Sequence, residues 1–322
     1  MPLERAGVKL VIDTDTAADD AIAIMLAAFD RDAEIVAVTT VAGNVPVEVA
    51  TRNARWVLER SGLGEVPVHP GAASPMVRPL TTGQDVHGES GMGSAEPPRQ
   101  PAPRSEPSAA AELVRLARAH EGELTLVTLG PLTNIATAVL LDPAFLTRFD
   151  RVVSMAGAAD GHGNISDVAE YNMWADPEAA HIVLSADGEV ELVGWDASRQ
   201  AAVIGSEECR AIEALGTETG AFVLALVSEL DRYCREVQGL GGFDLPDPLA
   251  MTVALDPAIV TGAEARPVRV GLADESRGQL MIDRRTAREA PRVRLLREMS
   301  RDRFLAMLYE MCTETALVGG RR

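Results

Sequence analysis

Short apolar runs alternate with helical stretches along this chain, and this alternation restricts the possible folds more than any other feature. Residues 9–12 (KLVI) have the pattern of a strand, and residues 21–29 have the pattern of a helix. The same order returns with a strand over 34–40 and a helix over 47–60. Further strands are predicted over 124–129, 151–155 and 190–193. The sequence therefore predicts an α/β fold, with a mostly parallel central sheet and helices on both faces.

The chain is expected to form one domain over residues 1–322. Its 322 residues, 47% of them hydrophobic, are enough for one large α/β core. Residues 94–107 contain five prolines, which cannot continue a helix or a central strand, and the same alternation resumes after them. We therefore expect a proline-rich surface loop there rather than a linker. Residues 284–322 are predicted to form a helical closure, with an amphipathic helix over 299–312.

The charge of the chain limits its partners. Thirty basic residues against 48 acidic residues give a net charge of −18, which repels the phosphates of nucleic acids and anionic membrane surfaces. No apolar run is long enough to span a bilayer, and the three cysteines show no paired spacing. We expect no nucleic-acid polymer and no membrane as a partner, and a reducing cytoplasm as the location.

Four aspartates follow the first predicted strand within eight residues: Asp13, Asp15, Asp19 and Asp20. One of them can cap the following helix, because free backbone N–H groups favour a carboxylate there. Four are too many for capping alone, and crowded carboxylates either take up protons or bind a cation. Ligands with oxygen atoms only favour a hard ion, Ca²⁺ or Mg²⁺. The cluster therefore predicts a metal site at the carboxyl end of this strand.

An apolar strand followed by Asp-x-Asp is also typical of haloacid-dehalogenase-type phosphatases that use Mg²⁺. In that class a downstream lysine holds the phosphoryl group, but Lys9 is the only lysine here and lies upstream. Ala17 stands where that motif has Thr or Val, and the charge of −18 does not favour phosphorylated substrates. This class remains an alternative.

Several separate segments together resemble the nucleoside hydrolases of the inosine-uridine preferring type. The segments appear in the order of that family: DTDTAADD (13–20), VAGN (41–44), HGESG (87–91), LGPLTN (129–134), GNISDVAEYNMWADPEAA (163–180) and PDPLA (246–250). The resemblance extends from about Lys9 to Asp283, and the combination is specific even though each segment alone is not. It implies hydrolysis of the N-glycosidic bond of ribonucleosides to free base and ribose, a reaction of nucleoside salvage.

The resemblance also implies a role for individual residues. Ca²⁺ would be bound by Asp15, Asp20 and Asp247 through their side chains and by Leu129 through its carbonyl. Asp15 would act as the general base on a calcium-bound water, with Asn44 orienting the base and the water. The remaining substrate-binding residues would be Asp19, His87, Asn164, Glu170 and Asn172. Asp13 would be a support, and Asn134 is interpreted as a turn or helix-start residue. A homodimer or homotetramer is expected from the family.

Two departures from the family pattern matter for chemistry. Thr16-Ala17 replaces Pro-Gly, so a positive φ at the glycine position would strain Ala17. Pro246 stands where the family often has a histidine that protonates the departing base, and proline cannot donate a proton. A homologue that binds nucleosides or ribose with calcium but does not catalyse is therefore a second alternative. Trp174, Tyr233 and Phe243 are candidates for stacking on the base, whose identity stays open.

Overall fold

The central strand of the fold, β1 (Val8–Thr14), pairs in parallel with β2 (Ala33–Thr40) on one side and β4 (Leu124–Thr128) on the other. The structure is a computed structural model that describes residues 7–98, 108–237, 239–285 and 292–314. The other strands are β3 (Val68–Pro70), β5 (Arg151–Met155), β6 (Glu191–Val193), β7 (Val203–Gly205), β8 (Gly242–Asp244), β9 (Val260–Val270), β10 (Leu280–Ile282) and β11 (Arg292–Met299).

One sheet contains most of these strands, in the order β10-β9-β11-β6-β5-β4-β1-β2-β3. Its strands run in parallel from β11 to β3, and β9 is antiparallel to both β10 and β11. β7 and β8 form a separate antiparallel pair. The carboxyl ends of β1, β2, β4 and β5 therefore meet at one edge of the sheet, where ligands of open α/β folds bind.

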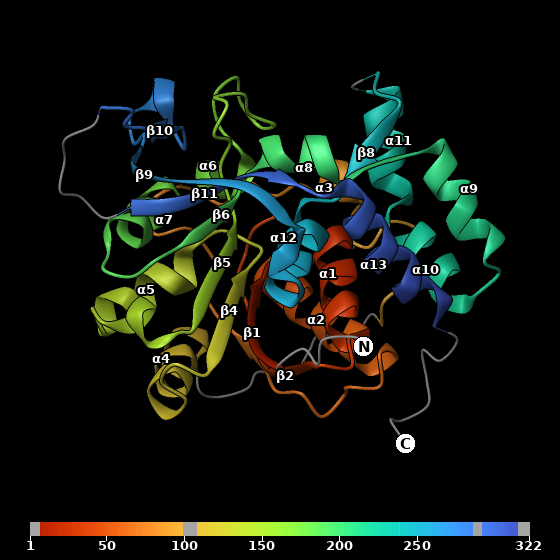
Figure 1. Ribbon diagram of the computed structural model, residues 1–322, viewed down its shortest axis with the longest axis horizontal. Coiled ribbons are helices and arrows are strands. Elements are labelled where there is room, and N and C mark those ends of the chain that lie inside the picture. The colour runs from red at the N-terminus through yellow and green to blue at the C-terminus, as the bar shows by residue number, and fades with distance from the viewer. Residues whose placement is uncertain (1–6, 99–107, 238, 286–291, 315–322) are drawn as a thin grey trace.

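Helices cover both faces of the sheet, as predicted. They are α1 (Ala18–Phe29), α2 (Val47–Arg60), α3 (Gln84–His87), α4 (Ala109–Ala119), α5 (Thr133–Leu141), α6 (Tyr171–Ala175), α7 (Pro177–Ser185), α8 (Trp195–Ala201), α9 (Ser206–Ala214), α10 (Glu218–Leu226), α11 (Ser228–Glu236), α12 (Pro246–Leu255) and α13 (Arg301–Thr313), with short 3₁₀ turns at Phe145–Arg148, Pro257–Ile259 and Asp274–Ser276. In Figure 1, α4, α5 and α7 lie to the left of the sheet, and α1, α12 and α13 lie to its right.

The side chains of β1 alternate between the two faces because the side-chain period of a strand is two residues. Leu10 and Ile12 pack into the core on the side of α1 and α12, whereas Val11 packs into the core on the side of α4 and α5. All three side chains are completely buried. This burial on both sides explains why a central strand has a continuous apolar run rather than an alternating pattern.

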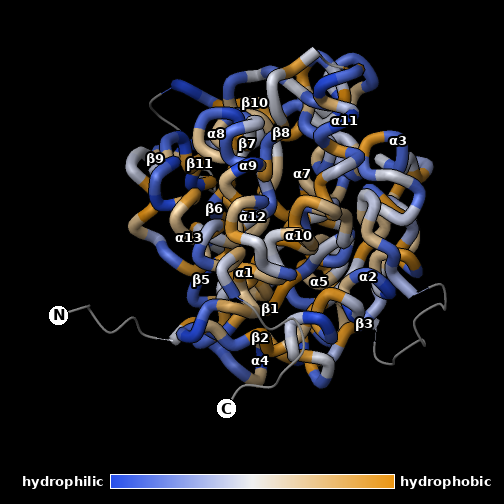
Figure 2. The backbone as a smooth tube through the Cα atoms, turned by 90° about the vertical axis from the view of Figure 1, so that its right-hand side faces the viewer, coloured by the Kyte–Doolittle hydropathy of each residue, from blue (hydrophilic) through white to orange (hydrophobic). Residues whose placement is uncertain are grey.

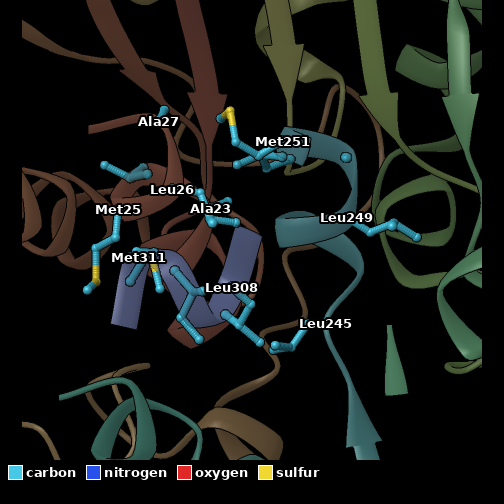
Figure 3. Packing of buried hydrophobic residues seen from close by; sticks show 14 of the residues in the cluster. Ala23, Met25, Leu26, Ala27, Leu245, Leu249, Met251, Leu308 and Met311 are labelled. Carbon is cyan, nitrogen blue, oxygen red and sulfur yellow. The ribbon is translucent and has the colours of Figure 1, made fainter. Parts of the chain in front are cut away.

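The larger core forms where α1 packs against α12 and α13. Met25 of α1, Leu249 and Met251 of α12, and Leu308 of α13 all belong to this core, and Figure 3 labels each of them. α1 contains five alanines, which form helices readily, and residues 18–28 of this helix are all buried. In Figure 2 the tube is largely pale or orange near α1 and α12 in the interior, and blue along many outer segments. This packing holds the first turns of α1 and α12 at the edge of the sheet where β1 ends.

The structure confirms the predicted strands and helices and changes one C-terminal prediction. β5 occupies the residues predicted for it, and α13 corresponds to the amphipathic helix expected over 299–312. However, the segment assigned to a helical closure also contains β11, which lies inside the sheet between β9 and β6. Leu295 and Leu296 of β11 are buried in opposite core clusters, which is the pattern of a strand covered on both faces.

Two further predictions concern the surface of the chain. Residues 94–98 have no helix or strand, in keeping with the predicted proline-rich loop, and residues 99–107 lie outside the described part. Residues 286–291 and 315–322 of the predicted closure also lie outside it. Within the described residues, no helix is both long enough and apolar enough to cross a lipid bilayer.

Candidate active site

Asp13 is held at the end of β1 by two residues from neighbouring segments. The Thr39 hydroxyl and the Asn134 side-chain amide, the latter at 2.8 Å, both donate to its Oδ1. Asp13 is completely buried, and this burial raises its pKa to about 7 although the two hydrogen bonds lower it. The scaffold therefore holds Asp13 through Oδ1, whereas its buried Oδ2 has no hydrogen-bond partner. The structure also gives Asn134, interpreted from sequence as a turn or helix-start residue, a place beside the acidic cluster.

Asp15 lies beyond the end of β1 with one oxygen bound and the other without a partner. Its Oδ2 accepts a hydrogen bond of 2.5 Å from the Asn44 backbone N–H, and its buried Oδ1 has no hydrogen-bond partner. Burial, followed by the charge of Asp20, raises its pKa well above the ordinary value. A Cβ at Gly43 would lie only 2.1 Å from Asp15 Oδ2, so the glycine permits this close approach.

Three more carboxylates converge from the first turns of α1 and α12. Oxygens of Asp19, Asp20 and Asp247 lie within 4.8 Å of one another, and all three residues are buried. Asp20 accepts hydrogen bonds from the Thr14 hydroxyl and the Ala17 N–H. Burial is the largest cause of the raised pKa of each, and it brings the pKa of Asp19 and of Asp20 to about 6. Mutual repulsion adds to these shifts.

The ligand set implied by the resemblance is only partly the same as this trio. Asp20 and Asp247 belong to both sets, whereas the geometric trio contains Asp19 in place of Asp15. Asp15 nevertheless lies close enough to raise the pKa of Asp247. The Leu129 carbonyl accepts a hydrogen bond of 2.7 Å from the side chain of Asn172.

A hard cation fits these residues. In the described part of the chain no lysine or arginine forms an ion pair with the cluster, so its negative charges are uncompensated by basic side chains. Asp15 Oδ1 and Asp19 Oδ1 are buried without a partner, a condition that costs free energy unless another group binds them. Asp13 Oδ2 and the uncharged Asn172 Oδ1 are two further buried oxygens without a partner. Oxygen donors alone suit Ca²⁺ or Mg²⁺.

Glu170 and Asn172 organise the segment between β5 and α6. Glu170 caps α6, because its carboxylate accepts hydrogen bonds from the N–H groups of Gly157, Asn172 and Met173. The Asn172 amide nitrogen donates to the carbonyls of Leu129 and Met155. Both side chains are buried, and each connects α6 to the ends of the central strands. We call Asp13, Asp15, Asn134 and Asn172 the floor group.

Three other predicted residues lie on loops or on the short helix α3, and we call Asn44, His87 and Asn164 the rim group. Asn44 is half-buried and Asn164 is exposed, with its Oδ1 accepting a 2.8 Å hydrogen bond from the Tyr171 N–H. His87 is buried, and its Nδ1 has no hydrogen-bond partner although it lies 4.0 Å from Asp19 Oδ1. Burial lowers the pKa of His87 to about 4, so the imidazole is neutral at pH 7.

The candidate stacking aromatics have different surroundings. Arg277 lies over the Trp174 ring at 3.7 Å from its centroid and donates to the Trp174 carbonyl. Phe243 is 2% exposed and belongs to the hydrophobic core. Tyr233 is half-buried on α11. Of the three, Tyr233 is the one whose ring is neither in the core nor covered by an arginine.

Residues 14–20 contain three of the aspartates, and we call this segment the acidic loop. Its backbone also differs from expectation. Ala17 has a φ of −92°, and the positive φ falls on Thr16, at 28°. The expected strain at Ala17 is therefore wrong. A β-branched residue with positive φ is a true outlier, so the strain lies one residue earlier. The Thr16 N–H donates to the Thr14 hydroxyl over 3.0 Å, which helps to hold this conformation.

Fold and site together define an α/β protein with a buried cluster of carboxylates, able to hold a cation, at the carboxyl edge of a parallel sheet. The chain belongs to the inosine-uridine preferring nucleoside hydrolase family, whose sequence model matches residues 10–306. It is therefore an enzyme that hydrolyses the N-glycosidic bond of ribonucleosides. Family membership leaves the phosphatase and the non-catalytic alternatives without support.

Relatives and solved structures agree with this family. The chain is 38% identical over 266 residues to the inosine-uridine preferring nucleoside hydrolase of Leishmania major, covering 82% of this chain and 83% of that protein. It is 34% identical to uridine nucleosidase 1 of Arabidopsis thaliana, covering 79% and 75%. A plant nucleoside hydrolase superposes with a TM-score of 0.89 at 29% identity, covering 95% of this chain and 99% of that one. A purine-preferring ribonucleoside hydrolase from Gardnerella vaginalis gives a TM-score of 0.87 at 29% identity, covering 95% and 98%.

Proposed function

We propose that this nucleoside hydrolase works with Ca²⁺, and that Asp15, Asp20 and Asp247 bind the ion through carboxylates and Leu129 through its carbonyl. The observation that carries the proposal is the buried cluster of carboxylates with no basic partner in the described residues. Several carboxylates and a carbonyl on a partly preformed frame suit the larger, more flexible coordination shell of Ca²⁺ better than that of Mg²⁺. When bound, the ion would make a coordinated water more acidic.

Asp15 is the general base in this proposal. Its Oδ2 is occupied by the Asn44 N–H, so the carboxylate is oriented with Oδ1 left to accept a proton from water. In the metal-free protein, burial and the charge of Asp20 raise the pKa of Asp15. Asn44 thus orients Asp15, the general base, through its backbone N–H as well as through any contact of its side chain.

The remaining residues bind the nucleoside. Asp19, Asn164, Glu170 and Asn172 are proposed to hold the ribose hydroxyls, and the unpartnered Oδ1 atoms of Asp19 and Asn172 are the ones ready to do so. The carboxylates also favour the positive charge that develops on the ribosyl group in the transition state. Neutral His87 is proposed to contact the substrate from α3. Pro246 begins α12 and has no proton to donate to the departing base.

The test is release of free base from a panel of adenosine, guanosine, inosine, cytidine and uridine, followed by chromatography. Protein treated with EGTA and shown by elemental analysis to be metal-free should release no base. Ca²⁺ should restore release, and Mg²⁺ should restore it less. Undiminished release by the metal-free protein would refute the calcium proposal. Nucleoside binding without release, or phosphate release from nucleotides alone, would refute the proposed reaction of this chain.

A further inference from the structure

Asn53 is a completely buried residue of α2 that lies outside the site described above. Its Nδ2 donates to the Thr16 carbonyl over 3.0 Å and to the Ser90 carbonyl over 2.9 Å. Its Oδ1 accepts from the guanidinium of Arg52 at 3.2 and 2.9 Å. Both amide hydrogens are therefore used, and Arg52 orients the amide so that its nitrogen faces the two carbonyls.

The first of these carbonyls belongs to the strained residue of the acidic loop. Thr16 has a φ of 28°, and such a conformation persists only where its surroundings hold it. The Thr14 hydroxyl accepts from the Thr16 N–H and donates to Asp20 Oδ1. A displacement of the Thr16 carbonyl would therefore shift the oxygen of a proposed calcium ligand.

The second carbonyl belongs to the loop that follows His87. This loop packs tightly against Val45, just before α2, because a Cβ at Gly91 would lie 2.6 Å from Val45 Cγ1, 3.5 Å from Asn53 Nδ2 and 3.7 Å from Ala17 Cα. Gly91 has a φ of 76°, which favours glycine. The loop returns to α3 through a 3.2 Å hydrogen bond from the Gly93 N–H to the His87 carbonyl. A shift of Ser90 is therefore expected to move His87 as well.

We propose that Asn53 is a positioning residue that couples the cation site to the loop carrying His87. One amide nitrogen joins two segments that are each 37 residues away in sequence, and no other part of the Asn53 side chain is free to relax. When a cation binds at the acidic loop, residues 87–93 become more ordered, although these residues provide no cation ligand. The inference rests on the proposed calcium site.

Hydrogen–deuterium exchange with Ca²⁺ alone, without nucleoside, tests this coupling. In the unmodified protein Ca²⁺ should slow exchange in residues 14–20 and also in 87–93, where the Gly91 and Gly93 N–H groups are hydrogen-bonded. We expect slowing by about fivefold or more in 87–93, the lower end of typical coupling between sites. In Asn53→Ser the slowing in 87–93 should fall below about twofold, while 14–20 still responds at a higher Ca²⁺ concentration.

Two variants on the same helix complete the design. Arg52→Ala removes the group that orients the Asn53 amide but is only half-buried, so it should fold and weaken the effect on 87–93. Thr51→Val is the matched control, because Thr51 is buried on the same helix and its hydroxyl hydrogen-bonds Val47 and Thr40 rather than Thr16 or Ser90. The Thr51→Val substitution should lower the free energy of unfolding and leave the Ca²⁺-dependent slowing of exchange in residues 87–93 unchanged. A residue with only a structural role would change exchange equally with and without Ca²⁺.

The possible results separate the two proposals. No slowing in 14–20 of the unmodified protein would overturn the calcium site and the inference together. Slowing in 14–20 without slowing in 87–93 would overturn the coupling alone. Undiminished slowing of 87–93 in both Asn53→Ser and Arg52→Ala, or its loss in Thr51→Val, would likewise overturn the role of Asn53.

Discussion

Asp13 of the floor group and His87 of the rim group are both buried polar residues, yet their surroundings differ. Asp13 Oδ1 receives two hydrogen bonds from side chains on β2 and α5, whereas His87 Nδ1 receives and donates none. The same contrast separates Asn172, bonded to the ends of β4 and β5, from exposed Asn164. The scaffold thus fixes the floor group through buried hydrogen bonds, although some of its oxygens stay unpartnered, whereas the rim group is held by fewer such bonds.

Among changes to the floor group, Asp15→Asn is expected to have the largest effect on activity. It removes the proposed general base and keeps the shape of the side chain. We expect turnover to fall by about 10²–10⁴-fold, the range of general base catalysis. The Asn44 N–H can still donate to the amide oxygen, so the fold should remain intact. The measurement is release of free base at saturating Ca²⁺ and nucleoside.

Thermal unfolding supplies the control for this variant. Burial and Asp20 raise the pKa of Asp15 in the folded, metal-free protein, so this group lowers stability as the pH rises above the ordinary pKa of an aspartate. At pH 8 in EGTA, Asp15→Asn should therefore melt no lower than the unmodified protein, and Ca²⁺ should stabilise the variant less. Turnover close to that of the unmodified enzyme would exclude Asp15 as the base.

Asn134→Ala and Asn164→Ala compare the two groups directly. Asn134 donates to Asp13 and to the Thr40 carbonyl and accepts from the Ala72 N–H, all in the buried interior. Its loss leaves these groups unsatisfied and should reduce the free energy of unfolding by about 2–4 kcal/mol. Asn164→Ala removes one hydrogen bond at an exposed position and should cost about 1 kcal/mol or less, with a raised KM.

Urea denaturation without Ca²⁺ measures both free energies, and nucleoside titration measures KM. Equal loss of stability in the two variants would contradict the distinction between floor and rim. An unchanged KM in Asn164→Ala would remove Asn164 from the substrate-binding residues.

The sequence predicted the parts of the molecule whose signals are local. The strand and the four aspartates at 9–20 are contiguous, so their place at the carboxyl end of β1 follows from the pattern alone. Asn134 joins the cluster only because α5 begins beside the end of β1, and one sequence contains no sign of that neighbour. β9 reads VTGAEARPVRV, with no run of consecutive apolar residues, a glycine and a proline inside it and mostly exposed or half-buried positions, and so gave no strand signal.

β11 was missed for a different reason. Its pattern RVRLLREM has apolar residues in the middle, flanked by arginines at both ends, and resembles one turn of an amphipathic helix as much as a short buried strand. The partners that decide between the two are β6 and β9, and they lie far away in sequence. Tertiary pairing overrides local preference here.

Thr16→Gly gives the smallest expected effect and tests whether the loop between β1 and α1, next to the floor group, stores strain. A β-branched residue at a φ of 28° costs on the order of 1–3 kcal/mol, whereas glycine adopts positive φ freely but loses about 0.5–1 kcal/mol through its flexibility when unfolded. The loss of the contact between the Thr16 and Thr14 hydroxyls, 3.1 Å apart, offsets a further part of the gain. The metal-free variant should therefore be more stable by about 0.5–1 kcal/mol in urea denaturation. Because the Thr16 carbonyl stays bonded to Asn53, Ca²⁺ affinity should change little; a marked loss of stability would show that the left-handed backbone at Thr16 is not strained.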